Sequence, residues 1–433
     1  MDVNITNNIL ASLYLLVWIL TFIWYQRKDK SVDGGSAVII TYILYGVFSI
    51  MSLNDPLFSL SYDPLTLFPY IYLYIMLIIA LAPIIYNHIH PANSITDPET
   101  RVLKIVAWII IISAITLVPS IIQNFGSGVI KLFTDIDAGK EAYMEQLEGA
   151  DDSGSGISNI FAIIYNSLSD IGVFLCFYYM TYGKKHFVLT ILLFVTLMIG
   201  LLIPVMNGQR GGTIITLLTI IGSYMIFRRY LSKKINHIMQ MVGIVIFVAV
   251  SLPITAITMS RFGDKITGVG GYITWYVGQG SLYFNNSALD AGGTRNGDRT
   301  FNLAKRVIDP QTPKNYNERR DKYHNLRIDD NIFSTFVGDF TIDFGPITAF
   351  FIFLIFNGYV ILKIKPENDK IKVHQLLLLY FTLCVSMQGG MALFSYSDTG
   401  NLRIITLFSL YAYLRYHEIL LKKFPLKTSI QYE

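Results

Sequence analysis

The sequence predicts an all-α polytopic membrane protein with about eleven transmembrane helices and one large extracytoplasmic loop that contains interfacial or re-entrant helices. The composition is the first reason, because the 433 residues are 53% hydrophobic and only 15% charged, whereas soluble domains carry roughly 25% charged residues. The second reason is that apolar stretches of about 20 residues, the length that spans a bilayer, recur along the chain. The third is the placement of Lys and Arg at alternate ends of these stretches.

The composition also excludes several classes of protein. A mean hydropathy of +0.48 leaves too much apolar surface for a soluble enzyme, a disordered chain or a nucleic-acid-binding protein. The two cysteines, Cys176 and Cys384, lie inside apolar runs, so the sequence predicts no disulfide framework. We therefore expect residues 1–433 to form a single transmembrane domain without a nucleic-acid partner.

Each predicted span is a stretch of about 20 largely apolar residues. Residues 1–8 lack the basic start of a signal peptide, so the first span is expected to be retained. The eleven spans cover residues 7–25, 36–53, 66–86, 102–121, 158–182, 187–207, 212–227, 236–256, 344–363, 372–391 and 401–417.

Basic residues orient these spans because Lys and Arg concentrate in cytoplasmic loops. With eleven spans, nineteen of the 34 basic residues fall on one side. This places the N-terminus outside and the C-terminus in the cytoplasm. The two long outer segments are an acidic loop, 122–157, with a short helix expected at about 137–149, and a large loop, 257–343, that carries eleven basic residues.

Three arginines stand at predicted outer helix ends: Arg210, Arg261 and Arg403. Arg210 belongs to the motif NGQRGGT, in which Gly211 and Gly212 begin a helix. A helix start with glycines exposes backbone N–H groups to an anion, and an arginine adds a bidentate phosphate ligand. The alternative is that each arginine reaches the lipid headgroups. Convergence of all three on one anionic group is the functional interpretation.

An aromatic and amphipathic segment, GYITWYVGQGSLYFNN, lies in the large loop and is too polar to span a membrane. It is typical of an interfacial or re-entrant helix. Its aromatic rings could stack on sugars while its amides bind hydroxyls; the alternative is an aromatic belt at the interface. The candidate substrate-binding side chains are those of Tyr272, Trp275, Tyr276, Tyr283, Asn285 and Asn286.

Three carboxylates, those of Asp339, Asp343 and Asp398, are candidates for acid–base chemistry, and a fourth, Asp170, is a functional candidate because it lies inside a span. Asp339 and Asp343 are four residues apart and would share one face of a helix; either could act as a general base, although helix N-capping is the favoured interpretation for Asp343. Asp398 precedes the last span. Asp170 lies within the fifth span, where its neighbours Asn166, Ser167 and Ser169 could satisfy it locally.

The order of these motifs in a many-span membrane domain resembles the O-antigen polymerase (Wzy) family of oligosaccharide repeat-unit polymerases. NGQRGG at an outer helix start, YITWYVGQGSLYFNN in the large loop and NIFSTFVGDFTIDFGPITAF entering the next span carry the resemblance. It implies a metal-independent, inverting glycosyltransferase on the outer face of the bacterial plasma membrane. The implied donor and acceptor are oligosaccharides on undecaprenyl pyrophosphate, within membrane lipid, and the implied protein partner is a chain-length regulator.

The resemblance also implies that arginines hold the pyrophosphate, and Arg210, Arg261 and Arg403 are the matching positions. Fixed guanidinium groups stabilise the charge that develops on the departing pyrophosphate, so no metal or other cofactor is expected. Asp339, Asp343 or Asp398 would supply the base. The alternative function is a flippase of the same lipid-linked oligosaccharide; a third is a metal-dependent transferase that uses Asp151 and Asp152.

Overall fold

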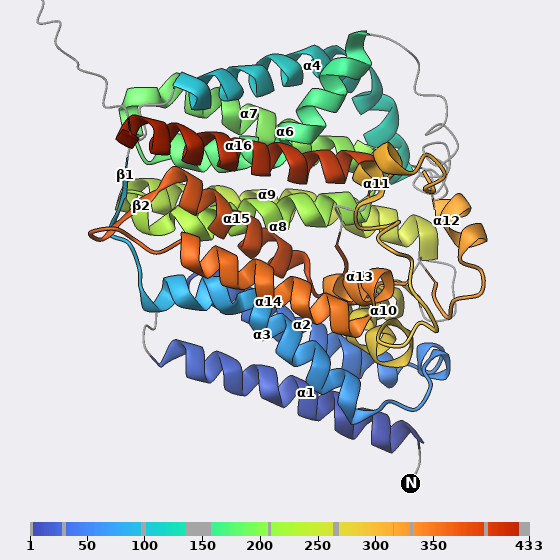
Figure 1. Ribbon diagram of the computed structural model, residues 1–433. Helices are drawn as coiled ribbons and strands as arrows, with labels where there is room; N and C mark the ends of the chain where they lie inside the picture. Colours follow the sequence, from blue (N-terminus) through green and yellow to red (C-terminus); the bar gives the residue numbers. More distant parts are fainter. Residues whose placement is uncertain are drawn as a thin grey trace, which may run out of the picture.

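The chain folds into a bundle of long helices that run between two ends of the molecule (Figure 1). The computed structural model describes residues 3–27, 32–96, 101–134, 157–206, 209–262, 268–314, 316–329, 332–393 and 397–423. We call one end the strand end, because it holds the parallel strands β1 (Ser94–Thr96) and β2 (Lys370–Lys372). We call the other the loop end, because the short helices of the large loop lie there (Figure 1).

The long helices follow the order of the predicted spans. They are α1 (Val3–Gln26), α2 (Gly34–Leu53), α3 (Leu67–Ile89), α4 (Arg101–Thr134), α6 (Ile157–Met180), α7 (Phe187–Met206), α8 (Arg210–Phe227), α9 (Lys233–Phe262), α14 (Pro346–Lys363), α15 (Val373–Gln388) and α16 (Asp398–Lys423). Short helical turns also occur at both ends of the bundle: η1 (Phe58–Ser61), η2 (Gly183–His186) and η3 (Arg228–Tyr230).

Within the described part of the chain, nine helices are long and apolar enough to cross a membrane. The protein is therefore a multi-pass, all-α membrane protein. The tenth and eleventh predicted spans correspond to α15 and α16 and are not among these nine: α15 has 16 residues and is short for a span, and the 26 residues of α16 include several charged side chains.

Several helices extend beyond the predicted ends of their spans, and two of them change the boundaries of the outer segments. The helix α4 continues to Thr134, so the acidic segment predicted from residue 122 begins as helix. The helix α9 continues to Phe262, which places Arg261 on its last turn instead of in the loop after it. The short helix expected at 137–149 lies outside the described residues.

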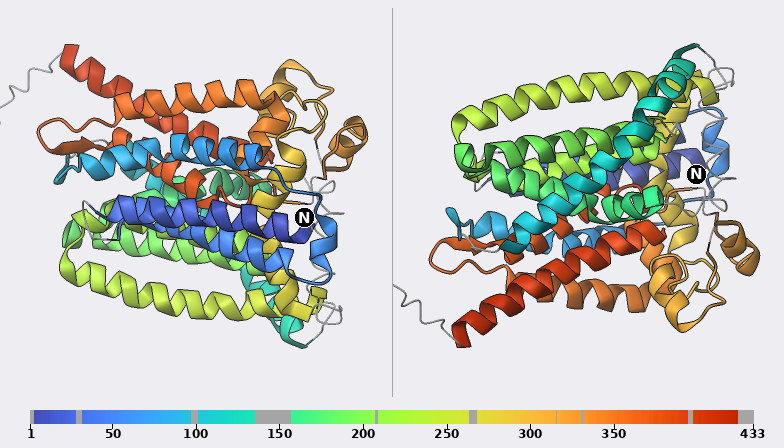
Figure 2. Two further views of the ribbon diagram at one scale, coloured as in Figure 1. Left: turned by 90° about the horizontal axis from the view of Figure 1, so that it is seen from below. Right: turned by 90° about the horizontal axis from the view of Figure 1, so that it is seen from above.

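Bulky aromatic side chains fill much of the space between the helices. Trp18, Phe174, Phe227 and Tyr380 are completely or almost completely buried. By contrast, many aliphatic side chains on the outer surface are exposed, which suits contact with lipid tails. The helix α9 is an extreme case, since only 6% of its most apolar window is buried, and it runs along one margin of the bundle in both views of Figure 2.

Four short helices and one π-helical turn build the loop end. They are α10 (Gly268–Tyr283), η4 (Phe284–Ala288), α11 (Asn302–Ile308), α12 (Tyr316–Lys322) and α13 (Thr335–Phe344). The helix α10 packs closely on α2, because Gly278 has no side chain: a Cβ atom there would lie 2.4 Å from the backbone carbon and oxygen of Phe48. This contact ties the aromatic segment of the large loop to the membrane helices.

Candidate functional site

Two arginines and two aspartates meet at the loop end in a buried charge cluster. Arg295 and Arg299 precede α11, while Asp339 and Asp343 lie on α13. Arg295 Nε is 2.8 Å from Asp343 Oδ1, and Arg299 Nε is 3.4 Å from Asp339 Oδ1. All four side chains are at most 5% exposed. The two arginines are four residues apart in the sequence, and so are the two aspartates. The first arginine contacts the second aspartate and the second arginine contacts the first, so the two segments match in antiparallel order.

Asp343 is fully occupied by contacts within the protein. Its Oδ1 accepts a hydrogen bond from Arg295 Nε, and its Oδ2 accepts bonds from the backbone N–H and the hydroxyl of Thr300, at 2.7 and 2.8 Å. It lies in the last turn of α13, and the following helix α14 has Gly345 as its N-cap without a side-chain bond. The expected N-capping role of Asp343 is therefore wrong; the carboxylate joins the large loop to α13.

Asp339 is less completely bonded than Asp343. Its Oδ2 accepts a hydrogen bond from the backbone N–H of Leu393 at 2.7 Å, whereas no hydrogen bond from the described residues reaches its Oδ1. Burial raises the pKa of the Asp339 carboxyl, and the positive charges of Arg299 and Arg295 only partly offset this effect. A buried carboxylate that has a raised pKa and one oxygen without a hydrogen bond has the properties of a general base.

The backbone around the cluster adopts conformations that hold these side chains in place. Asn296 and Gly297 both have positive φ, 52° and 82°, and together they turn the chain between Arg295 and Arg299. Thr335, the first residue of α13, has φ of 69°, a strained value for a β-branched residue. Its N–H donates to Met391 O at 2.8 Å, which anchors the start of α13 on the segment after α15.

A second carboxylate group lies beside the cluster. Asp298 accepts hydrogen bonds from Lys305, from Lys322 at 2.7 Å and from the hydroxyl of Tyr323 at 2.6 Å. Burial raises the pKa of Asp298, but these bonds outweigh that effect and hold the pKa below its usual value. Asp298 is thus a permanent anion that joins α11 and α12 to the loop.

Asp398, the third candidate base, lies at the first residue of α16. Its carboxylate contacts Arg306 of α11 and accepts a hydrogen bond from Asn302 Nδ2 at 3.0 Å. The Asp398 side chain is 50% exposed, unlike Asp339 and Asp343. The three candidate bases therefore differ in their surroundings, and Asp339 has the most suitable one for proton transfer.

The described part of the NGQRGGT motif, which begins at Gln209, forms the start of α8. Gln209 is the N-cap residue, without a side-chain bond to the helix, and Arg210 begins the helix. A Cβ atom on Gly211 would lie 3.2 Å from the hydroxyl of Tyr276, so two separate sequence motifs meet at this point. A Cβ on Gly212 would instead lie 3.1 Å from the ring of Pro204 at the end of α7. The side chains of Arg210 and Arg261 lie outside the described residues, and their convergence stays a prediction.

Arg403 bonds within the bundle. Its Nε donates to the carbonyl oxygen of Asn166 at 2.8 Å, and its Nη1 is 3.8 Å from Asp170 Oδ1. Both side chains are about one-third exposed. The hydroxyls of Ser167 and Ser169 instead bond to backbone carbonyls of their own helix. The partner of Asp170 is therefore the arginine on α16 and not the local polar cluster.

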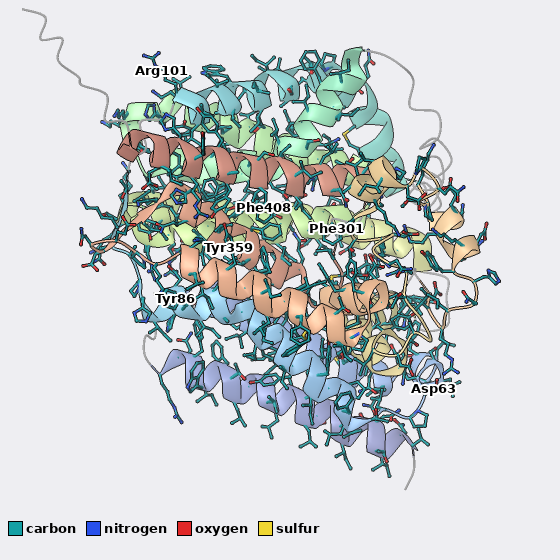
Figure 3. The ribbon with its side chains drawn as sticks, in the orientation of Figure 1. Asp63, Tyr86, Arg101, Phe301, Tyr359 and Phe408 are labelled. Carbon is teal, nitrogen blue, oxygen red and sulfur yellow. The ribbon has the colours of Figure 1, made fainter. Side chains whose placement is uncertain are left out.

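The side chains of the aromatic segment mostly contact other parts of the protein. Trp275 stacks on Phe58 with ring centroids 5.2 Å apart, and Tyr272 meets the same ring edge-on. The oxygen of Tyr283 accepts a bond from the N–H of Asp329. The amide of Asn285 bonds both the N–H and the carbonyl of Thr66, and that of Asn286 donates to the carbonyl of Asp63, which lies near the loop end in Figure 3.

These contacts occupy the polar groups of Tyr283 and Asn285 within the fold. Tyr276 lies between Gly211 and the ring of Phe333, whose centroid is 4.8 Å away. Of the six predicted substrate-binding side chains, Tyr276 is therefore the one that the structure brings next to the NGQRGGT motif. The sugar groove itself stays a prediction.

Arg295 and Arg299 were not among the predicted site residues, although both lie in the predicted large loop. Eleven basic residues in that loop gave no reason to choose these two. The usable signal was the matched spacing of Arg295 and Arg299 with Asp339 and Asp343. Among the described residues, no group of three or more His, Cys, Asp or Glu side chains is placed to hold a metal ion.

No protein-family model, curated protein or solved structure matches this chain. The support for a function therefore comes from the geometry of the loop end and from the motifs in the sequence.

Proposed function

We propose that the protein is a metal-independent, inverting glycosyltransferase that polymerises oligosaccharide repeat units carried on undecaprenyl pyrophosphate, as in the O-antigen polymerase (Wzy) family. The observation that carries the proposal is the Arg299–Asp339 pair: a buried arginine beside a buried carboxylate, one oxygen of which accepts no hydrogen bond from the described residues. The first can stabilise a departing pyrophosphate, and the second can accept a proton. The sequence motifs resembling that family lie around the same end of the bundle.

The proposed topology has eleven spans, with α15 and α16 as the last two. The strand end then faces the cytoplasm, and the loop end faces outward from the bacterial plasma membrane. The basic residues support this orientation: α4, α7 and α9 all begin at the strand end with Lys or Arg in or just before their first turn. In this topology the N-terminus is outside and the C-terminus is cytoplasmic.

In the proposed reaction, Arg299 changes its partner from Asp339 to the substrate. The pyrophosphate of the donor replaces Asp339 as the partner of Arg299, and Arg210, Arg261 and Arg403 provide further positive charge. Loss of the neighbouring guanidinium raises the pKa of Asp339 further, which makes its carboxylate a stronger base. Because Arg299 and Asp339 are almost fully buried, this exchange requires movement of the loop around residues 297–301.

In the chemical step, the acceptor hydroxyl oxygen forms a bond to the anomeric carbon of the donor sugar. The bond from that carbon to the pyrophosphate oxygen breaks, and its electron pair leaves with the pyrophosphate. The hydroxyl proton passes to Asp339. Attack opposite to the leaving group inverts the anomeric configuration. Asp343 does not compete for the proton because Arg295 and Thr300 already occupy both of its oxygens.

The test uses the purified full-length protein in liposomes with an undecaprenyl-pyrophosphate-linked repeat unit and EDTA. A ladder of glycan lengths is expected. Transport of the repeat unit across the bilayer without a ladder would instead identify a flippase. Activity that disappears with EDTA and returns with a divalent cation would contradict the metal-independent mechanism.

Arg210→Ala provides a separate test of the arginine at the start of α8. Long glycan should be lost while single repeat units and the amount of protein in the membrane are unchanged. Normal chain lengths in this variant would contradict the role of Arg210 in holding pyrophosphate.

A further inference from the structure

An apolar cavity of about 340 Å³ lies beside the charge cluster, between α13, α14, α15 and α16. Seven of the residues that line it are phenylalanines; among them are Phe340, Phe353, Phe356, Phe381 and Phe408. Several of these rings are only partly buried. We call this space the phenylalanine crevice. Its size falls at the lower end of the range of roughly 300–1,000 Å³ that is typical of ligand pockets.

The crevice runs along the helices and has two different ends. Toward the strand end, the hydroxyls of Tyr359 on α14 and Tyr411 on α16 are 2.9 Å apart and close the gap between these helices. Toward the loop end, the lining consists of Thr300, Phe301 and Leu393. Figure 3 labels Tyr359, Phe408 and Phe301, which follow one another from the strand side to the loop side.

The end of the crevice toward the loop end adjoins the charge cluster directly. Thr300 lines the crevice and also donates two bonds to Asp343, and Leu393 lines it while its N–H donates to Asp339. Arg299 is the residue before Thr300. An apolar chain in the crevice would therefore place the polar group at its end beside Arg299.

The polar side chains within the crevice do not require a polar ligand. Asn357 Nδ2 donates to the carbonyl of Phe353 at 2.9 Å, and the hydroxyl of Thr382 donates to the carbonyl of Leu379 at 2.9 Å. Their donors are thus satisfied by their own helices. Thr300 and Ser386 are the other two polar residues of the lining, and the rest of the wall is aliphatic and aromatic, which favours a hydrocarbon chain.

We propose that the phenylalanine crevice binds the first isoprene units of the polyprenyl chain of one lipid-linked substrate. The proposal rests on the proposed function, because that function supplies a single apolar chain attached to a pyrophosphate. One apolar cavity with a cationic residue next to one of its ends matches this chemistry. A phospholipid, with two acyl chains on one headgroup, does not match a single crevice of this size.

Photo-crosslinking tests the occupant without requiring catalysis. The full-length protein, in nanodiscs of phosphatidylcholine, is labelled with a polyprenyl phosphate that carries a diazirine near the phosphate and no sugar. Labelled peptides are expected from α14 and α16, and an excess of unmodified polyprenyl phosphate should suppress the labelling. Equal suppression by phosphatidylglycerol, or labelling confined to other helices, would overturn the proposal.

Two substitutions on α16 provide a matched pair. Ile404 lines the crevice, whereas the next residue, Ile405, is 45% exposed on the outer surface. Ile404→Trp should fill the crevice and reduce labelling by about tenfold, a ratio equivalent to about 1.4 kcal/mol of binding free energy. Ile405→Trp should leave the labelling unchanged. Equal labelling of both variants would contradict the proposal.

A smaller substitution covers the case in which Ile404→Trp does not fold. Val385→Phe narrows the crevice from α15 and should also reduce labelling. The two proposals can fail separately. A glycan ladder that Ile404→Trp and Val385→Phe do not change would reject the crevice but not the polymerase. Specific labelling of α14 and α16 without any ladder would reject the polymerase but not the crevice.

Discussion

The two ends of the bundle use charged residues in different ways. At the strand end, Lys372 contacts Glu367 and Glu418 at 2.8 and 2.7 Å, and these three side chains are 18–62% exposed. At the loop end, Arg295 and Asp343 form a pair in which both side chains are 0% exposed. Exposed ion pairs contribute little to the free energy of folding and lose little hydration, whereas a buried ion pair must compensate for a large desolvation penalty. The loop end therefore carries charges that membrane folding alone does not require.

The same contrast occurs within the loop end, on a single helix. Both carboxylate oxygens of Asp343 accept hydrogen bonds. Asp339 lies beside the phenylalanine crevice, and its Oδ1 accepts no hydrogen bond from the described residues. The two carboxylates are four residues apart on α13. We infer that Asp343 stabilises the loop and that Asp339 takes part in the reaction.

The largest expected effect on stability is that of Asp343→Asn. Removing one charge of a buried pair leaves Arg295 without its counter-ion, which typically costs about 3–5 kcal/mol. The free energy of unfolding in detergent should fall by that amount. Asp321→Asn is the control, because the side chain of Asp321 is 77% exposed. Equal stability of the two variants would show that the buried pair contributes no more to stability than an exposed carboxylate.

Asp339→Asn should affect activity more than stability. Loss of a general base typically lowers the rate by about 10²–10⁴-fold, so the glycan ladder should disappear while the protein still folds. The free energy of unfolding should fall less than in Asp343→Asn. A variant that retains the wild-type rate of polymerisation would show that Asp339 is not the base.

The pH dependence of Asp339 has opposite signs for rate and for stability. The rate needs the carboxylate and should rise as pH increases through its raised pKa. A carboxyl whose pKa is higher in the folded state contributes stability below its unfolded pKa, and this contribution is lost as pH rises through the folded pKa. The wild-type free energy of unfolding, relative to Asp339→Asn, should therefore fall with rising pH. A rate that falls over the same range would contradict the assignment.

The packing of the loop end on the membrane helices can be tested with two glycines of α10. Gly278→Ala forces a Cβ against the backbone of Phe48 and should cost about 1–3 kcal/mol. Gly270→Ala, on the same helix, meets no atom within 4 Å and should stabilise by roughly 0.5–1 kcal/mol, because alanine favours helix more than glycine does. Equal thermal stability of the two variants would mean that α10 is not held closely on α2.

The smallest effect is expected at the strand end. Lys372→Ala removes two partly exposed ion pairs and should change the free energy of unfolding by less than about 1 kcal/mol. High salt should reduce even this difference, because solvent ions screen exposed pairs. A loss similar to that of Asp343→Asn would show that the two ends do not differ.

Much of the fold could be predicted from the sequence, but less of the site. The spans could be found because each depends on a continuous run of apolar residues. Asp343 was expected to cap the next span, because N-capping was judged from its distance to that span, whereas it lies in the last turn of α13. Its real partners, Arg295 and Thr300, are more than 40 residues away in the chain.

Arg403 gives the same lesson for a membrane helix. Its position near a helix end suggested a contact with an anionic headgroup or substrate. The structure pairs it with Asp170 on α6, 3.8 Å away, a partner that the sequence did not indicate. Nothing local in either segment indicates that α6 and α16 are neighbours, since that depends on how the whole bundle packs.

The sequence by itself determined that this is a membrane protein and which segments are long apolar helices. These properties depend on composition, on the length of apolar runs and on the placement of charges, all of which are local. Tertiary structure decided which arginine meets which aspartate, that Gly211 meets Tyr276, and that an apolar crevice ends beside Arg299. These contacts join residues far apart in the chain, and only the packing of the helices brings them together.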